Sequence, residues 1–302
     1  MPSDPIDAAV PGQPVSLTQN LRVLRAANPS PLTGSGTNSY LIGRGEVTVL
    51  DPGPADPAHL QALLAALRPG ERITRILISH AHLDHSALAP ALKAATHAPV
   101  LAFGTARDGL NPAWQGLSGL GGGEGCDHSF TPDIRLADGQ ILTGDDWQLE
   151  ALHTPGHLGN HLCFVMGEGI FSADLAMGWA TSIVSPPDGD MSDYMASLDR
   201  LIARAPKVLW PGHGAPVDPA LPRLEALRAH RLSREAQILT ALHDGPGTAA
   251  ELAARIYTEV DPSLLPAASR NVLAHLLDLS QRRLAAAHPA ATRDALWSLP
   301  EA

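Results

Sequence analysis

Seven side chains that can bind a divalent metal ion are concentrated in four short stretches of this 302-residue chain. The stretches are SHAHLDH (79–85), HTPGH (153–157), FSAD (171–174) and PGHG (211–214). Neutral imidazole and carboxylate are ligands that zinc prefers, and iron and manganese accept the same donor types. The candidate ligands are His80, His82, Asp84, His85, His157, Asp174 and His213. A set of this size is enough for two metal ions.

The first stretch carries the densest part of the set. It follows ITRILI (73–78), an apolar run rich in branched residues that predicts a buried strand ending in a polar turn. Strand alternation points His80 and His82 the same way, and the turn lets Asp84 and His85 reach a neighbouring position. Three histidines and an aspartate within six residues have no evident packing purpose. We therefore predict that this turn serves two metal ions and is more than an ordinary polar loop.

Two metal ions held about 3.5 to 4 Å apart can share a hydroxide that attacks an electrophile. We hypothesise a dinuclear hydrolase in which this hydroxide attacks an acyl or phosphoryl centre while the second metal stabilises the developing negative charge. Metal-bound water can have a pKa near about 7, so no separate strong base is required. The leaving group would take its proton from a metal-bound water or from Asp84, our candidate catalytic residue, and the sequence does not choose between them.

The order of these motifs resembles the dinuclear metallo-β-lactamase superfamily. The matching motifs are HxHxDH, TPGH, a strand ending in Asp174, and PGH, and two more stretches look like the family, TNSYLIG (37–43) and VLDPGP (49–54). The resemblance runs from about Asn38 to Trp297 and therefore covers nearly the whole chain. It implies an α/β (α+β) fold, the αββα sandwich, in which ligand clusters at strand ends lie between two packed sheets.

The family pattern also implies how the ligands divide between the metals. The first metal would be held by His80, His82 and His157. The second would be held by Asp84, His85 and His213, and Asp174 would bridge both. We expect two divalent ions per chain, with Zn²⁺ as the first choice and Fe or Mn as alternatives. Leu158 replaces the Thr or Ser that many relatives have there, which removes a supporting hydrogen bond and leaves the ligands unaffected.

Other residues are predicted to support or line the site. We expect Asp51, which ends the strand in VTVLD, to hold ligands without binding metal, and His153 and His161 to have supporting or packing roles near the third motif. Past Asp174, the stretch 181–201 contains polar side chains that would face the substrate or else form turns and helix caps. These are Ser182, Ser185 and Tyr194.

The bridging aspartate narrows the activity that the resemblance implies. The β-lactamases of the superfamily usually lack an Asp at the position of Asp174, so a true β-lactamase is not expected. Glyoxalase II thioesterases share the seven ligands but carry a differently built helical tail. Three hypotheses remain, which are a hydrolase of small esters, thioesters or lactones, a single-strand-specific endoribonuclease, and a non-catalytic winged-helix regulator that keeps its metals for structure.

The sequence changes character beyond residue 220. Three amphipathic helices are predicted between residues 222 and 284, with Thr248 capping the second. Together with HPAATRDALWSL they resemble the winged-helix tail of the β-lactamase-like protein 2 family, in which some members are single-strand-specific endoribonucleases. We therefore predict a catalytic domain over 1–220 and a winged-helix-like domain over 221–302.

The third tail helix argues against specific binding of duplex DNA. Asn271, His275 and Asp278 occupy positions where a reading helix usually has basic residues. We expect this helix to form a lid or the wall of a homodimer, a simpler role than DNA recognition. Three tail arginines would contact substrate phosphates or pair with nearby glutamates on a solvated face, and we favour pairing. The residues concerned are Arg228, Arg231, Arg234, Glu225 and Glu235.

The net charge of −10 is unevenly distributed. Residues 221–302 contain nine Arg and nine acidic residues, so the whole excess lies in the catalytic part. Lys93 and Lys207 are the only lysines in the sequence, which disfavours broad, sequence-blind coating of nucleic acid. Two divalent ions would nevertheless make the site locally cationic, so charge argues only weakly against a single-stranded RNA substrate, while a small-molecule substrate fits the acidic chain.

Composition favours a globular protein with a large core. Apolar residues make up 44% of the chain, and no stretch approaches the roughly 18 uninterrupted apolar residues of a membrane span. The start of the sequence has no basic or apolar export segment, so we expect a cytoplasmic protein without a membrane partner. Cys126 and Cys163 are too few for a disulfide framework, and Cys163 reads as a small core residue.

The elements that position the motifs follow from periodicity and turn signals. Strands are predicted at 21–27, 39–42, 47–51, 73–78 and 98–103, and helices at 57–68 and 86–96. Ser86 is a candidate N-cap for the second of these helices. Residues 104–133 lack periodicity and predict a long, mobile loop near the site. A hairpin with Asp138 and Gly139 at its turn is predicted in IRLADGQILTG (134–144).

Overall fold

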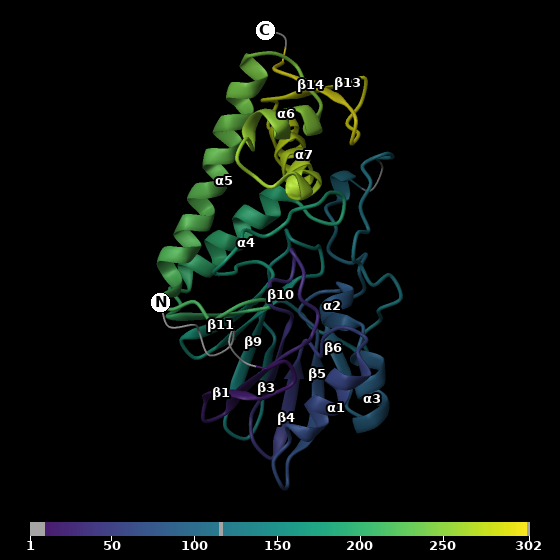
Figure 1. Cartoon of the computed structure of the whole chain (residues 1–302), viewed down its shortest axis with the longest axis vertical. Coiled ribbons are helices and arrows are strands. Elements are labelled where there is room, and N and C mark those ends of the chain that lie inside the picture. Colours follow the sequence, from purple (N-terminus) through teal and green to yellow (C-terminus); the bar gives the residue numbers. More distant parts are fainter. Residues whose placement is uncertain (1–9, 115–116, 301–302) are drawn as a thin grey trace.

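The computed structural model describes residues 10–114 and 117–300, and within these ranges two β-sheets form the centre of the larger lobe (Figure 1). The strands of the first sheet lie in chain order, which is β1 (Val15–Thr18), β2 (Leu21–Arg25), β3 (Asn38–Ile42), β4 (Glu46–Leu50), β5 (Arg72–Leu77), β6 (Val100–Ala102) and β7 (Ile134–Arg135). Pairing is antiparallel from β1 to β4 and parallel from β4 to β7.

The second sheet is shorter and contains the strands that lead to the later motifs. Its order is β12 (Val208–Pro211), β11 (Gly169–Ala173), β10 (Leu162–Met166), β9 (Gln148–His153) and β8 (Ile141–Thr143). Only β11 and β12 are parallel among these pairs. Tyr40 of the first sheet meets Phe171 of the second edge to face, with ring centroids 5.1 Å apart. Apolar side chains of both inner faces form one core between the sheets.

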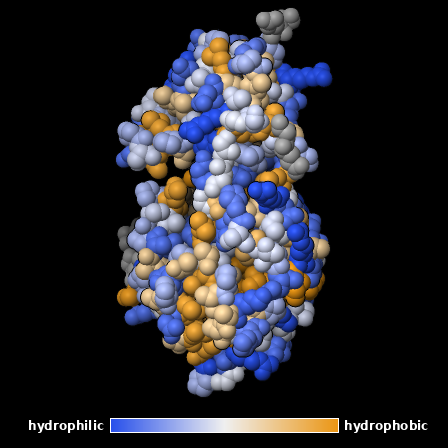
Figure 2. All heavy atoms as spheres, turned by 90° about the vertical axis from the view of Figure 1, so that its right-hand side faces the viewer, coloured by the Kyte–Doolittle hydropathy of each residue, from blue (hydrophilic) through white to orange (hydrophobic). Residues whose placement is uncertain are grey.

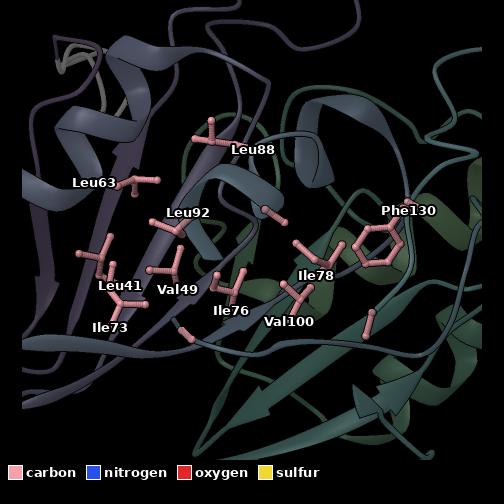
Figure 3. Close-up of a cluster of buried hydrophobic side chains, with 14 of the residues drawn as sticks. Leu41, Val49, Leu63, Ile73, Ile76, Ile78, Leu88, Leu92, Val100 and Phe130 are labelled. Carbon is pink, nitrogen blue, oxygen red and sulfur yellow. The ribbon is translucent and has the colours of Figure 1, made fainter. Parts of the chain in front are cut away.

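Helices cover the outer face of each sheet. On the first sheet, α1 (Pro57–Ala65) and α3 (Ala89–Thr96) bury Leu63 and Leu92 against the outward side chains of β4 and β5 (Figure 3). On the second sheet, α4 (Met191–Ala203) and the first turns of α5 (Ala220–His243) form the corresponding layer. This confirms the predicted αββα sandwich.

The C-terminal lobe has a core of its own. It consists of the remainder of α5, α6 (Ala249–Ile256), the short 3₁₀ turn η2 (Pro262–Leu264), α7 (Leu265–Gln281) and the hairpin of β13 (Ala286–His288) and β14 (Leu296–Ser298). Thr248 caps α6, because its hydroxyl accepts from the backbone N–H of Glu251 while the Glu251 carboxylate accepts in return. Three helices followed by a two-stranded wing confirm the predicted winged helix.

The two lobes share one helix. The first half of α5 buries Leu224 and Leu227 in the core of the larger lobe, and its second half buries Ile238 and Leu242 in the winged-helix core. Figure 2 shows the two lobes in space-filling form with a notch between them on one side. Within the described ranges, no helix is long and apolar enough to cross a membrane.

Two local predictions are wrong. Residues 134–144 do not form a hairpin, because β7 lies in the first sheet and β8 in the second, and buried Leu136 belongs to the core between them. The Asp-Gly pair therefore turns the chain from one sheet to the other. Ser86 does not cap a helix, since a short helix, α2 (Leu83–Ser86), already begins inside the ligand motif. Ser86 Oγ lies 3.0 Å from both His82 O and Asp127 Oδ2, which share its single proton.

In its described parts, 104–114 and 117–133, the long segment is anchored by packing and hydrogen bonds, contrary to the expectation of a mobile loop. The 3₁₀ turn η1 (Pro112–Trp114) and Leu120 insert buried side chains into the winged-helix core. The indole N–H of Trp114 donates to Asp190 at 2.7 Å, and Gly119 O accepts from Arg293 N at 2.9 Å. The C-terminal lobe therefore holds the segment that borders the site.

Candidate metal centre

The four ligand motifs meet at one edge of the sandwich, because each follows the carboxyl end of a strand. The first motif follows β5, and the others follow β9, β11 and β12, so both sheets contribute. Three groups of side chains bring potential ligand atoms within 4.8 Å of one another. The groups are His80, His82 and His157; His80, His85 and Asp174; and Asp84, His85 and His213. All seven sequence-predicted ligands are thus brought together.

Three ring nitrogens converge in the first group. Nε2 of His80 lies 2.9 Å and Nε2 of His157 lies 3.0 Å from Nδ1 of His82. The other nitrogen of His157 lies 2.6 Å from Ile183 O, and since a carbonyl only accepts, that nitrogen carries the proton. Nδ1 of His80 contacts Ser79 Oγ, whose own proton goes to Asp51, so this nitrogen is also the donor. Both Nε2 atoms therefore present lone pairs at the same point, as metal ligands must.

The second group follows the same logic. Nδ1 of His85 donates to Asp51 at 3.0 Å, and Nδ1 of His213 faces the carbonyl of Gly36 at 3.2 Å. Their Nε2 atoms point at carboxylates, with His213 lying 3.2 Å from Asp84. Nε2 of His85 has no hydrogen-bond partner in the described part of the chain although it is fully buried. A buried unpartnered lone pair beside carboxylates fits a divalent ion.

Asp174 lies between the two groups. Its Oδ1 is 3.4 Å from His85 Nε2, and its Oδ2 is 3.3 Å from His213 and 3.7 Å from His157. Ala173, at the end of β11, has a positive φ of 42°, which turns Asp174 away from the strand direction at a break in the register with β12. A side chain at Gly212 would meet Asp174 Oδ1 at 2.4 Å, so only glycine fits this approach.

Asp51 connects the two groups from behind. It follows β4 with a positive φ of 53°, an uncommon backbone conformation outside glycine. Its carboxylate accepts from the N–H and the hydroxyl of Ser79, each at 2.7 Å, and from His85 Nδ1. Ser79 in turn contacts His80. One carboxylate thus fixes the ring orientation of a histidine in each group.

Burial and charge act oppositely on the two groups of histidines. Burial lowers the pKa of His82 to about 3 and lowers the pKa of His80 and His157 as well, so these rings are neutral at pH 7. Burial also opposes the charged form of His213, but the carboxylate of Asp174 and its hydrogen bond outweigh it and raise the pKa to about 9. The carboxylates therefore create a place for positive charge, and bound cations would supply it.

The other predicted site residues take different positions. His161 is buried with its ring centroid 5.1 Å from that of His80, and Nδ1 contacts Thr154 Oγ1 at 3.0 Å. His153 stacks on Phe103 and contacts Gly159 O, so its contacts lie with the loop that follows the third motif. Leu158 fills the apolar core of the first sheet.

The three candidate substrate contacts are used inside the protein. The hydroxyl of Ser182 donates to Asp174 O at 2.6 Å and lies 3.2 Å from His157 Nδ1. Ser185 accepts from Arg270 at 2.8 Å. Tyr194 is fully buried, and its hydroxyl donates to Leu175 O. Their role in substrate binding stays a prediction.

The favoured pairing of the tail arginines with Glu225 and Glu235 is wrong. Arg228 pairs with Asp199 of α4, and Arg234 bonds Gln237 and lies over the ring of Tyr257. Arg231 is buried, donates to Ser182 O, and lies over the ring of Tyr194. The reason is that α5 packs along the larger lobe, so Arg228 and Arg231 meet partners from that lobe, Asp199 and Ser182 O, in place of glutamates of their own helix.

Sequence reasoning missed residues that hold the ligands from behind. Ser79 was visible as the first letter of SHAHLDH but has no metal-ligand chemistry of its own. Thr37, which contacts Asp84 at 3.3 Å, comes from a distant segment with no local signal. Arg231 was considered only for substrate contact or ion pairing, and its bond to Ser182 O was missed. Such partners become visible only when the strands are placed side by side.

Comparisons with known proteins agree with this geometry. The metallo-beta-lactamase superfamily matches residues 32–213, and the beta-lactamase associated winged helix domain matches residues 248–297. A beta-lactamase-like protein 2 homolog from Drosophila melanogaster is 30% identical over 280 residues, which cover 88% of this chain and 89% of that protein. An atrochrysone carboxyl ACP thioesterase from Aspergillus fumigatus is 27% identical over 245 residues, covering 78% of this chain and 70% of that protein.

Solved structures share the whole architecture. A beta-lactamase domain protein from Burkholderia ambifaria superposes with a TM-score of 0.79 at 21% identity, covering 99% of this chain and 97% of that chain. A metallo-beta-lactamase family protein from Thermus thermophilus has a TM-score of 0.75 at 23% identity, covering 94% of this chain and 100% of that chain. At these identities the likeness shows the fold alone. The family matches and the relatives show that this chain belongs to the metallo-beta-lactamase superfamily and is a metal-dependent hydrolase with a C-terminal winged helix.

Proposed function

We propose that this chain hydrolyses a small acyl substrate, an ester, thioester or lactone, with two divalent metal ions, of which Zn²⁺ is the first choice and Fe or Mn are alternatives. The observation that carries the proposal is the pair of ligand groups joined by His80, His85 and Asp174 at one edge of the sandwich. Metal ions there would supply activation of water and polarisation of the carbonyl under attack. We also propose that the boundary between the hydrolase domain and the winged-helix-like domain lies near residue 220.

The protein's own residues have separate roles in this proposal. His80, His82 and His157 would hold one ion, and Asp84, His85 and His213 the other, with Asp174 between them. Asp84 is the carboxylate ligand with more exposure, its side chain being 28% exposed against 11% for Asp174. Asp84 can therefore reach a bound substrate, orient the attacking water and carry its proton toward the leaving group.

An apolar rim beside Asp84 supports an acyl substrate. Leu83 stands between His82 and Asp84 in the sequence, and it is 49% exposed. Trp179 is 47% exposed. The indole N–H of Trp179 donates to His213 O at 3.3 Å, and a side chain at Gly214 would meet the ring at 2.6 Å. Half-exposed apolar side chains fixed next to a ligand provide contact area for an acyl chain or ring.

The names of relatives point the same way. The Aspergillus fumigatus protein is a thioesterase that acts on an acyl group carried by ACP, and a protein of the same name from Aspergillus chevalieri is 28% identical over 228 residues, covering 74% of this chain. A thioester has a good leaving group and an electrophilic carbonyl, which suits attack by activated water. We therefore place thioesters first among the acyl substrates.

A single-strand-specific endoribonuclease is the second candidate, and the likeness to the beta-lactamase-like protein 2 homolog favours it. The phosphodiester would occupy the same site. The third candidate, a regulator with structural metals, requires no turnover at all. Because α7 is largely buried between the lobes, it has no free face for the major groove of DNA.

One assay separates the three candidates. Acyl thioesters and esters of graded chain length are tested beside labelled single-stranded RNA, using the wild type, Asp84→Asn and the control Asp199→Asn on the exposed face of α4. We expect thioester hydrolysis that Asp84→Asn abolishes and Asp199→Asn retains. If the chain instead cleaves RNA and Asp84→Asn abolishes that cleavage, the endoribonuclease replaces the acyl hydrolase as the proposed function. RNA cleavage that survives Asp84→Asn indicates contamination, and no turnover of any substrate favours the regulator.

Metal analysis tests the dinuclear part separately. We expect about two equivalents of zinc, iron or manganese per chain, in line with two ligand groups. Less than one equivalent per active chain contradicts a dinuclear site whatever the substrate.

A further inference from the structure

The segment between Asp174 and α4 has no regular secondary structure, and its carbonyl groups need hydrogen-bond donors from elsewhere. Three arginines of the C-terminal helices supply them. Arg223 of α5 donates to Met177 O and to Ala180 O, each at 2.8 Å. Further along the segment, Arg231 of α5 donates to Ser182 O. Arg270 of α7 donates to Pro186 O and to Ser185 Oγ.

The same segment touches the predicted ligands on its other side. Ile183 O fixes the tautomer of His157 at 2.6 Å, and Ser182 Oγ donates to Asp174 O at 2.6 Å. Residues 182–183 therefore link the predicted ligands to the C-terminal helices. They contact His157 and Asp174 on one side and Arg231 on the other. Displacement of the link would move His157 and Asp174 together.

Arg231 and Asn271 form the centre of this contact. Asn271 Oδ1 accepts from Val184 N at 3.0 Å and from Arg231 at 3.2 Å, so α5 and α7 grip adjacent residues of the segment. Arg231 is 2% exposed and Asn271 7% exposed. A guanidinium buried this deeply is costly unless all its bonds are made, which indicates a fixed arrangement.

We infer that Arg231 and Asn271 are positioning residues for the metal centre, and that the winged-helix lobe serves to hold His157 and Asp174 in place. The inference rests on the metal-binding roles proposed above. It gives the C-terminal lobe a function in catalysis that requires no nucleic acid. It also explains why Arg270 and Asn271 of α7 point inward to the segment and not outward to solvent.

The test measures metal binding by the full-length chain. Arg231→Met and Asn271→Leu remove the grip, while Asn271→Asp keeps the acceptor for Val184 N. Arg228→Met is the control, because Arg228 is on the same helix but forms a surface pair with Asp199. Affinity for Zn²⁺ is measured by chelator competition, the ligand geometry by the absorption spectrum of the Co²⁺ form, and folding by thermal unfolding of the metal-free chain.

We expect Zn²⁺ affinity to fall about 10- to 100-fold in Arg231→Met and Asn271→Leu, as is usual when a group that orients a metal ligand is lost. The Co²⁺ spectrum should change in both, whereas Asn271→Asp and Arg228→Met should resemble the wild type. Lower melting temperature with unchanged Zn²⁺ affinity and unchanged spectrum would overturn the inference and leave a purely structural role. If Arg231→Met does not fold, the Asn271 pair decides alone. Failure of the wild type to bind metal would instead overturn the proposed function.

Discussion

Replacement of His275 by Leu should make the protein more resistant to acid. His275 is on α7 and is 2% exposed, and neither ring nitrogen has a hydrogen-bond partner within residues 10–114 and 117–300. Burial, with smaller contributions from Arg231, Arg282, His230 and Arg234, lowers its pKa from 6.5 to about 3. The ring is therefore neutral in the folded protein but takes up a proton in the unfolded chain below pH 6.5.

The size of the effect follows from proton linkage. A lowered folded-state pKa contributes stability that is present above the unfolded pKa and is lost as the pH falls from 6.5 toward 3. Each pH unit in that window is worth about 1.36 kcal/mol, so at pH 5 the wild type has lost about 2 kcal/mol through His275. Leucine has a similar volume, takes up no proton and leaves no donor or acceptor unpaired.

The assay is urea denaturation of the metal-free wild type and His275→Leu at pH 7.5 and pH 5. We expect His275→Leu to be at least as stable as the wild type at pH 7.5, and its advantage to grow by about 2 kcal/mol at pH 5. His243→Leu, at the exposed end of α5, controls for loss of an imidazole. A stability advantage of the same size at both pH values would refute the argument, because it would show that the pKa of His275 is the same in the folded and unfolded states.

Three further changes test the metal centre and its rim. Asp51→Asn should weaken Zn²⁺ binding about 10- to 100-fold in chelator competition, since Asp51 orients His85 and, through Ser79, a histidine of the other group. Ser79→Ala should destabilise the metal-free chain by about 1 to 3 kcal/mol in urea denaturation, because it leaves the buried Nδ1–H of His80 without an acceptor. Equal urea midpoints for the wild type and Ser79→Ala would contradict this. Trp179→Ala should raise KM for long or aromatic acyl thioesters with kcat nearly unchanged, and equal KM values for short and long chains would remove Trp179 from the rim.

The convergence of the candidate metal ligands was largely predictable because its signal is local. His80 to His85 follow a strand whose apolar run is evident in the sequence, and the remaining motifs also end strands of recognisable pattern. Strands of a packed sandwich that end at the same edge must bring those ends together. The fold and the convergence of the seven side chains were therefore accessible from the sequence and from its resemblance to a family.

The supporting residues were less accessible because their partners are distant in sequence. Thr37 contacts Asp84 across 47 positions, and Arg231 contacts Ser182 across 49. Serine, threonine and arginine have many common surface roles, so nothing in their local pattern indicates a buried partner. The predicted hairpin at Asp138 failed for a related reason, since turn chemistry gives the bend but not which sheet each flanking strand joins.

The polar residues of α7 show the limit of local pattern most clearly. Asn271, His275 and Asp278 are unlike the residues of a helix that reads DNA, and in the sequence their polarity suggests a lid or a dimer wall. The structure instead turns Asn271 toward a segment of irregular backbone whose N–H and carbonyl groups need partners. A loop that lies against predicted metal ligands must be fixed by hydrogen bonds, and in this chain Arg223, Arg231 and Arg270 of the tail helices donate several of them. A polar position on a buried helix face is therefore better taken as a sign of an irregular neighbour than as a sign of solvent.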